Sequence, residues 1–158
     1  MKNPTTVERK SDRELVVTRT VDGPARLVFE AWTRPELFRR WWVPRSAPVT
    51  LLSCEMDART GGSYRLVFRF GEQTMAFFGT YLEVTPSSRL VWTNDEGGPE
   101  AAAVTTVTFE EHDGRTLLTM LDLHPSKEAL DAAIASGSTD GTPETMDQLE
   151  ELVATLPR

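Results

Sequence analysis

The chain has 158 residues, of which 39% are hydrophobic and 26% charged, and its formal net charge is −7. This length and composition indicate one globular domain with a sizeable core, and no apolar run approaches the roughly 20 residues that a membrane-spanning helix needs. An acidic chain without a basic cluster is also a poor nucleic-acid binder, because neutralisation of phosphates supplies most of that affinity.

The first third of the chain predicts a strand followed by two short helices. Residues 1–12 are polar and lack periodicity, so they are expected to form a flexible tail before a single domain over residues 13–158. Residues 14–21 are rich in β-branched side chains, which favour a strand. Asp22 is expected to cap the next helix at its N-terminus. Apolar spacing then predicts helices over about 24–33 and 35–41.

From residue 47 onward the pattern changes to strands joined by short turns, which is typical of an antiparallel meander. In residues 63–70, apolar Tyr64, Leu66, Phe68 and Phe70 alternate with polar side chains, so one face of this strand should be buried. Asp113-Gly114 has the chemistry of a two-residue hairpin turn. The six expected strands are 49–56, 63–70, 74–84, 89–94, 104–110 and 115–124.

The C-terminal residues have helical periodicity, broken at 136–141. Ser126 is expected to cap the first part and Thr142 the second, with Pro143 in its first turn. The pattern fits a long helix with a break or two collinear helices. A sheet with one apolar face must cover that face, and no other element is long enough to do so. The predicted fold class is therefore α+β, with strand, two helices, six strands and a long C-terminal helix gripped by a curved sheet.

A helix laid across a strongly curved sheet leaves space at one end, which large side chains either fill or line. Trp41 and Trp42 stand just before Pro44, and they either pack in the core or lie at the mouth of a cavity. The candidate ligand contacts are the large apolar side chains expected to face this space, together with one carboxylate: Phe29, Trp32, Phe38, Trp41, Trp42, Tyr64, Leu66, Phe68, Phe78, Trp92, Met120, Asp122, Ile134 and Met146. Ile134 and Met146 would contact a ligand only if the cavity is real.

Two polar motifs accompany these residues. Asp57 and Arg59 are expected to form a salt bridge or to bond the turn at Gly61-Gly62, with a catalytic carboxylate as the alternative. No helix follows Gly61-Gly62, so it predicts a turn or bulge rather than a phosphate loop. Asp122 and His124 share a strand face, where they could transfer protons, although His124 could instead be solvated.

The reactive side chains match no metal or nucleophile motif. Cys54, His112 and His124 have no zinc-site spacing, so neither a metal nor a cofactor is expected. The start of the chain has no secretory signal pattern. Because Cys54 is the single cysteine, a reducing, cytoplasmic setting is the expectation.

The order of elements resembles the helix-grip fold of the START-like (SRPBCC) superfamily. The motifs resemble its branch named after the C-terminal domain of the activator of the heat-shock protein 90 ATPase, from about residue 14 to 156. The chain departs from that pattern at Val43, where glycine is common, and at Thr142, where many relatives carry tryptophan. The resemblance is carried by Val21-Asp22-Gly23-Pro24, Trp41-Trp42-x-Pro44, Asp57-x-Arg59-x-Gly61-Gly62-x-Tyr64, Gly79-x-Tyr81-Leu82-Glu83-Val84-x-Pro86, Arg89-Leu90-Val91-Trp92-Thr93 and Pro125-Ser126 through Leu149-x-x-Leu152.

Because this fold hosts carriers, receptors, cyclases and chaperone cofactors, three functions stay open. The first is binding of a small hydrophobic or aromatic molecule between the sheet and the C-terminal helix, since such pockets are mostly apolar. The second is a cyclase- or hydrolase-like enzyme using the same cavity. The third is a cofactor of a chaperone ATPase, ranked last because the chain has no room for the separate N-terminal domain of the eukaryotic activator.

Two further expectations concern association and motion. A homodimer could form through an exposed strand edge or through the outer face of the sheet, where Val67, Phe77 and Tyr81 are expected to leave apolar surface. The break between Gly137 and Gly141 would be a natural gate, because a helix interrupted by two glycines can move without unfolding the sheet.

Overall fold

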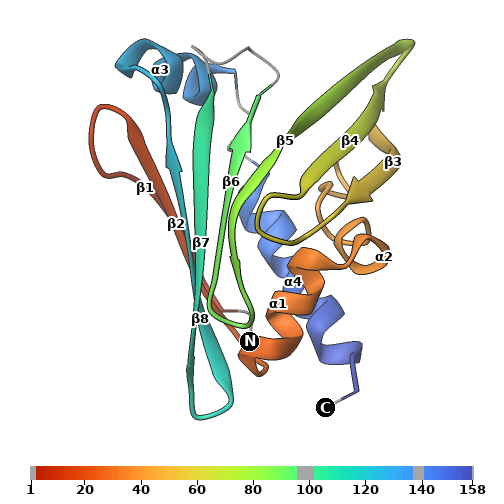
Figure 1. The fold of residues 1–158 in the computed structure, drawn as a ribbon, viewed down its shortest axis with the longest axis vertical. Helices are drawn as coiled ribbons and strands as arrows, with labels where there is room; N and C mark the ends of the chain where they lie inside the picture. The colour runs from red at the N-terminus through yellow and green to blue at the C-terminus, as the bar shows by residue number, and fades with distance from the viewer. Residues whose placement is uncertain (1–2, 96–101, 137–140, 158) are drawn as a thin grey trace.

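The computed structural model describes residues 3–95, 102–136 and 141–157, which form one eight-stranded sheet and four helices (Figure 1). Every neighbouring pair of strands is antiparallel. In Figure 1, β3–β5 splay away from β2 and β8, with α1 and α4 between them. The strands are β1 (Thr5–Arg9), β2 (Glu14–Val21), β3 (Val49–Met56), β4 (Ser63–Phe70), β5 (Gln73–Thr85), β6 (Arg89–Asn94), β7 (Ala103–His112) and β8 (Arg115–Leu123). The helices are α1 (Ala25–Thr33), α2 (Pro35–Phe38), α3 (Lys127–Ala135) and α4 (Thr142–Thr155).

The sheet order is β1-β2-β8-β7-β6-β5-β4-β3. The strands β3–β8 form the six-stranded meander, and β2 pairs with its last strand, β8. The β7–β8 turn has φ of 53° at Asp113 and 78° at Gly114, the left-handed pair that a two-residue hairpin turn requires. Register shifts at Leu51/Ser53 in β3 and at Tyr81/Glu83 in β5 mark bulges. Bulges bend a strand and increase its twist, which accounts for the curvature at this end of the sheet.

The segment expected to be a flexible tail contains β1, so that prediction is wrong for Thr5–Arg9. This strand pairs with β2 from Thr5↔Arg19 to Arg9↔Leu15. Its side chains are largely exposed. An edge strand that buries neither face has no alternation of apolar and polar residues, so the sequence pattern does not predict it. It pairs through the backbone N–H and C=O groups that β2 would otherwise leave free.

The helix caps agree with the sequence at one of three positions. Ser126 Oγ accepts a hydrogen bond from the backbone N–H of Ala129 and caps α3 as expected. Asp22 does not cap α1, which begins after Pro24; its carboxylate accepts from Arg115 instead. Thr142 is the first residue of α4 rather than its cap. α2 is also shorter than expected and ends at Phe38.

The core lies between the sheet and the helices α1, α2 and α4. α4 covers the sheet with its buried side chains, and it contacts both α1 and β1. α3 is separate from this layer and buries only Leu130 among its described side chains. The α+β architecture predicted from the sequence is confirmed, with β1 added at one edge. The proposed gate falls mainly on residues 137–140, outside the described residues.

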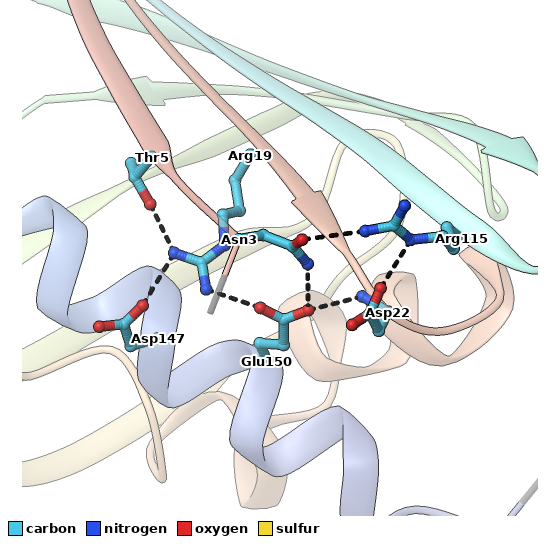
Figure 2. Close-up of polar contacts among 7 residues, drawn as sticks. All are labelled: Asn3, Thr5, Arg19, Asp22, Arg115, Asp147 and Glu150. Atoms are coloured by element: carbon cyan, nitrogen blue, oxygen red, sulfur yellow. Dashed lines mark hydrogen bonds and ion pairs between the residues drawn. The ribbon is translucent and has the colours of Figure 1, made fainter. Parts of the chain in front are cut away.

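A polar network attaches α4 to the β1–β2 edge of the sheet (Figure 2). Arg19 lies on β2 among buried apolar residues and is itself buried. Its Nη1 donates to Thr5 Oγ1 at 2.7 Å and to Asp147 Oδ1 at 2.8 Å, and its Nη2 donates to Glu150 Oε1 at 2.6 Å. Opposite charges from a strand and a helix therefore meet beneath the covering helix.

Glu150 extends this network beyond Arg19. Its Oε2 accepts from Asn3 Nδ2 at 2.7 Å and from the backbone N–H of Asp22 at 2.8 Å. Arg115 in turn donates to Asp22 Oδ1 and to Asn3 Oδ1. One glutamate on α4 thus connects the N-terminal segment, the end of β2 and, through Arg115, the β7–β8 hairpin.

Candidate functional site

A cavity of about 250 Å3 lies between the α1–α2 region and the half of the sheet formed by β3–β6. We call it the inner cavity. Large aromatic side chains make up most of its wall, and Asn94 contributes an amide. It is lined by Trp32, Phe38, Trp42, Met56, Tyr64, Leu66, Phe68, Phe77, Tyr81, Trp92 and Asn94.

Strand alternation explains which residues of β4 and β5 line this cavity. Tyr64, Leu66 and Phe68 share one face of β4 and are buried. Leu66 pairs with Phe77 across the ladder, and directly paired residues project to the same face, so Phe77 also enters the wall. Phe78 pairs with Arg65 on the opposite face.

The structure therefore corrects the assignment of faces on β5. Phe78, expected to line the cavity, is 42% exposed, and Phe77 takes its place. Phe77 and Tyr81 were expected on the outer face, but both line the inner cavity. The apolar outer surface predicted from these two residues is absent. The exposed large apolar side chains of β4 and β5 are instead Phe70, Met75, Phe78 and Leu82.

The paired tryptophans have different positions. Trp41 is fully buried, and its Nε1 donates to the backbone oxygen of Ala31 at 2.9 Å, which is core packing. Trp42 is partly buried, stacks on Phe38 with ring centroids 4.7 Å apart, and lines the cavity. Phe29 lies in the core against Phe109 and does not line either described cavity.

Trp32 lies at the centre of the aromatic cluster. Its ring centroid is 4.7 Å from that of Trp41, 5.8 Å from that of Trp42 and 5.8 Å from that of Trp92. The ring lines the inner cavity, yet Trp32 Nε1 is buried and has no hydrogen-bond partner. A buried donor left unpaired costs roughly 1–3 kcal/mol. Trp32 therefore contributes its ring to the cavity wall, while its N–H stays buried without a partner.

A second, larger cavity of about 690 Å3 lies between α3–α4 and the strands β2, β7 and β8. We call it the outer cavity. Met120, Asp122 and Met146, all expected at a cavity, line it. Ile134 is 38% exposed and does not, because α3 presents Ala129, Ala132 and Ala133 to this space. The two cavities share Trp42, Phe77, Trp92 and Asn94.

A chain of polar side chains runs from the inner to the outer cavity. Tyr64 Oη donates to the backbone oxygen of Thr93 at 2.8 Å or to Asn94 Oδ1 at 3.0 Å. Asn94 Nδ2 donates to Thr105 Oγ1 at 3.3 Å, and Thr105 Oγ1 donates to Asp122 Oδ1 at 2.6 Å. Register places these residues side by side, because Thr105 pairs with Asp122 across the β7–β8 ladder.

Burial shifts the titration of two groups at these cavities. Removal from water raises the pKa of Asp122 above its ordinary value, and the Thr105 hydrogen bond and nearby His124 oppose that rise. Burial likewise raises the pKa of Tyr81 well above the ordinary tyrosine range. His124 lines the outer cavity together with Asp122, so the two residues expected to share a strand face do meet the same space.

Asp57 and Arg59 form an ion pair at the end of β3, one of the contacts expected from the sequence. Arg59 Nε donates to Asp57 Oδ2 at 2.8 Å, and both side chains are exposed. The turn after them holds β5, because the backbone N–H of Gly61 donates to Tyr81 O and the Tyr81 N–H donates to Gly62 O. A Cβ on Gly62 would lie 2.0 Å from the backbone oxygen of Asp57.

Gln148 on α4 is a site-positioning residue that sequence reasoning missed. This buried side chain donates from Nε2 to the backbone oxygens of Trp41 at 2.9 Å and Val43 at 2.8 Å. Its Oε1 accepts from the N–H of Arg45 at 2.8 Å. It therefore holds the segment that carries Trp42 into the wall of both cavities. The sequence does offer one sign of this role, because Gln148 is a polar residue within the apolar stripe of Met146, Leu149 and Leu152.

The described residues contain no group of three or more His, Cys, Asp or Glu side chains that could hold a metal ion. No helix among them is both long and apolar enough to cross a bilayer.

Solved structures share this fold over nearly the whole chain. A crystal structure of a Rhodobacter sphaeroides protein matches with a TM-score of 0.87 and 22% identity, covering 98% of this chain and 100% of that chain. A Nitrosomonas europaea protein matches with a TM-score of 0.80 and 27% identity, over 93% and 97% of the two chains. An AHSA1-like protein from Aeromonas hydrophila matches with a TM-score of 0.68 and 19% identity, over 88% and 92%.

Comparison with curated proteins yields no match. The family model described as "Activator of Hsp90 ATPase homolog 1-like protein" matches residues 22–154, which include every element from α1 to nearly the end of α4. Because this match spans most of the chain, the chain belongs to the activator of Hsp90 ATPase homolog 1-like family.

Proposed function

We propose that this protein binds a small hydrophobic or aromatic molecule in the inner cavity. The observation that carries the proposal is an aromatic-walled, partly open cavity of about 250 Å3 in the domain. Protein interiors are close-packed, and voids larger than a water molecule are few. An engineered apolar cavity of about 150 Å3 is enough to bind benzene. The inner cavity therefore has room for one or two rings.

The chemistry of the wall supports an apolar ligand. Ligand pockets are mostly lined by hydrophobic and aromatic side chains with a few polar anchors, as this one is. Burial of about 200 Å2 of ligand surface would contribute roughly 5 kcal/mol before the costs of association.

The proposed binding place differs from the one expected from the sequence. The expected cavity lay between the sheet and the C-terminal helix, whereas the described wall of the inner cavity includes residues of α1 and α2 but none of α4. The space beneath α3 and α4 is the larger and more polar outer cavity. A carrier or receptor role in the cytoplasm, the setting suggested by the lone cysteine, belongs to the same proposal.

Butylbenzene binding, followed by calorimetry and by tryptophan fluorescence, tests this function. Trp32, Trp42 and Trp92 all line the cavity, so an occupant should change their emission. Leu66→Phe places a larger side chain in the cavity wall and should weaken binding at least about tenfold, since lost contacts of about 1.4 kcal/mol suffice for that change. Leu82→Phe is the matched control, because Leu82 is exposed and lines neither cavity.

Native mass spectrometry after gentle purification would show whether a ligand accompanies the protein. Saturable binding of butylbenzene that Leu66→Phe weakens and Leu82→Phe leaves unchanged supports the proposal. Absence of binding to the unmodified protein, or equal binding by both variants, would overturn it.

A further inference from the structure

We propose that the ligand is a neutral or cationic aromatic amphiphile, whose ring occupies the inner cavity and whose amine or hydroxyl group is held by Asp122 in the outer cavity. This inference rests on the proposed function and adds the chemical class of the ligand. It depends on three properties of the site: the continuity of the two cavities, the direction of the hydrogen bonds between them, and the charge of their walls.

The two cavities form one bipartite site because they share part of their walls. Trp42, Phe77, Trp92 and Asn94 line both. Trp92 and Asn94 are two residues apart on β6 and project to the same face of the sheet. A molecule that leaves the inner cavity along these side chains passes from an aromatic wall to one that contains Thr105 and Asp122.

Hydrogen bonds along this wall connect Asn94 to Asp122 through Thr105. Asn94 Nδ2 donates to Thr105 Oγ1, so the single hydroxyl hydrogen of Thr105 is available for Asp122 Oδ1, which lies 2.6 Å away. The donors in this series of hydrogen bonds are therefore directed to protein acceptors. The series ends at the carboxylate of Asp122. Its Oδ1 accepts from Thr105, and its second oxygen can accept a hydrogen bond from a ligand.

The charge of the walls excludes an anionic ligand group. The described residues lining the two cavities include no lysine and no arginine, and Asp122 is their single carboxylate. A carboxylate or phosphate placed here would lose water without gaining a fixed counter-charge and would face Asp122. An ammonium or hydroxyl group would instead form a charge-assisted hydrogen bond with it. Burial already raises the pKa of Asp122, so this carboxylate gains from a donor that replaces water.

A matched series of probes tests the inference: butylbenzene, 4-phenylbutylamine, 4-phenylbutanol and 4-phenylbutyrate. They share a ring and a flexible arm and differ in the terminal group. Binding of all four probes is measured at the same pH, 8.5. The amine should bind the unmodified protein at least about tenfold more tightly than the butyrate, with the alcohol between them.

Asp122→Asn isolates the contribution of the carboxylate. Asparagine keeps an oxygen that can accept from Thr105 Oγ1, so the hydrogen-bond chain remains. The variant should weaken 4-phenylbutylamine binding by roughly tenfold, and it should change butylbenzene binding by a much smaller factor. Asp113→Asn removes the same charge from the exposed β7–β8 turn, where asparagine suits the left-handed backbone, and should change neither.

The outcomes separate this inference from the function on which it rests. If butylbenzene binds but the amine and the butyrate bind equally, or Asp122→Asn has no effect on the amine, the inference is wrong and the proposed function stands. If the butyrate binds most tightly, the ligand is an anion and the inference is likewise overturned. If butylbenzene itself fails to bind, both proposals fall together.

Discussion

Arg19 Nη2 on β2 lies 2.6 Å from Glu150 Oε1 on α4, and the Arg19 side chain is 1% exposed (Figure 2). The Asp147 and Glu150 side chains are 26% and 16% exposed. The network therefore places a buried cation between two partly buried carboxylates at the junction of helix and sheet. Arg19 Nε has no hydrogen-bond partner, so the guanidinium is not fully satisfied even here. Removing one partner of such a pair is costly because the other charge remains buried.

Arg19→Met should lower the free energy of unfolding by about 3 kcal/mol, because it removes the buried cation that pairs with both Asp147 and Glu150. Urea unfolding measures this change. Arg45→Met is the matched control, since Arg45 pairs with Glu151 in the exposed setting where an ion pair contributes less than about 1 kcal/mol. Similar losses of unfolding free energy in Arg19→Met and Arg45→Met would show that the buried position of Arg19 does not strengthen its ion pairs.

Gln148→Glu should destabilise the protein by about 3 kcal/mol and disturb the cavity wall. The substitution replaces the amide that donates to the carbonyls of Trp41 and Val43 with a buried carboxylate that cannot donate when ionised. Tryptophan emission should shift in the folded variant because the segment carrying Trp42 loses its support. Gln73→Glu, at an exposed strand end, should leave both stability and emission unchanged. An unshifted spectrum in Gln148→Glu would mean that the segment is held by other contacts.

Gly62→Ala should cost about 3 kcal/mol or more, because the added Cβ would lie 2.0 Å from the backbone oxygen of Asp57 and the turn would have to open. Thermal and urea unfolding both report this loss. In Gly71→Ala the new Cβ meets open space, and the φ of +62° alone should cost about 1 kcal/mol. The prediction fails if the two alanines have equal effects, since the difference comes from the close approach of the Asp57 backbone.

Asp122→Asn should raise the free energy of unfolding at neutral pH in the absence of ligand. Burial raises the pKa of Asp122 in the folded state, so the folded protein favours the protonated carboxyl and loses stability as pH rises through that raised value. The gain from Asp122→Asn should therefore be largest at pH 7–8 and should shrink as pH falls toward the ordinary value of 3.8.

Asp131→Asn provides a control of opposite sign. Hydrogen bonds from Lys127 and Arg9 lower the pKa of Asp131, so its ionised form adds stability that is lost as pH falls. Asp131→Asn should be less stable than the unmodified protein at neutral pH and should approach it in acid. Urea unfolding between pH 4 and pH 8 compares the two variants. A gain for Asp122→Asn that does not change with pH would rule out ionisation as its cause.

Local patterns in the sequence determined the type and order of most elements. The bounds expected for three of the six meander strands are those of β3, β4 and β6. Period-two alternation and turn residues act between neighbours in the chain, so they can be read without knowledge of the fold. The same holds for the Ser126 cap, the Asp113-Gly114 turn and the exposed ion pair of Asp57 with Arg59.

Only the tertiary structure decided which side chains meet. Strand register places Phe77 rather than Phe78 in the inner cavity, and pairing with β2 turns a polar N-terminal segment into β1. Arg19 and Glu150 are distant in sequence and unremarkable by type. Their contacts depend on long-range pairing and on how far the sheet curves away from its helices. The long-range pairing and the curvature depend on the packing of the whole chain, so they cannot be predicted from local sequence patterns.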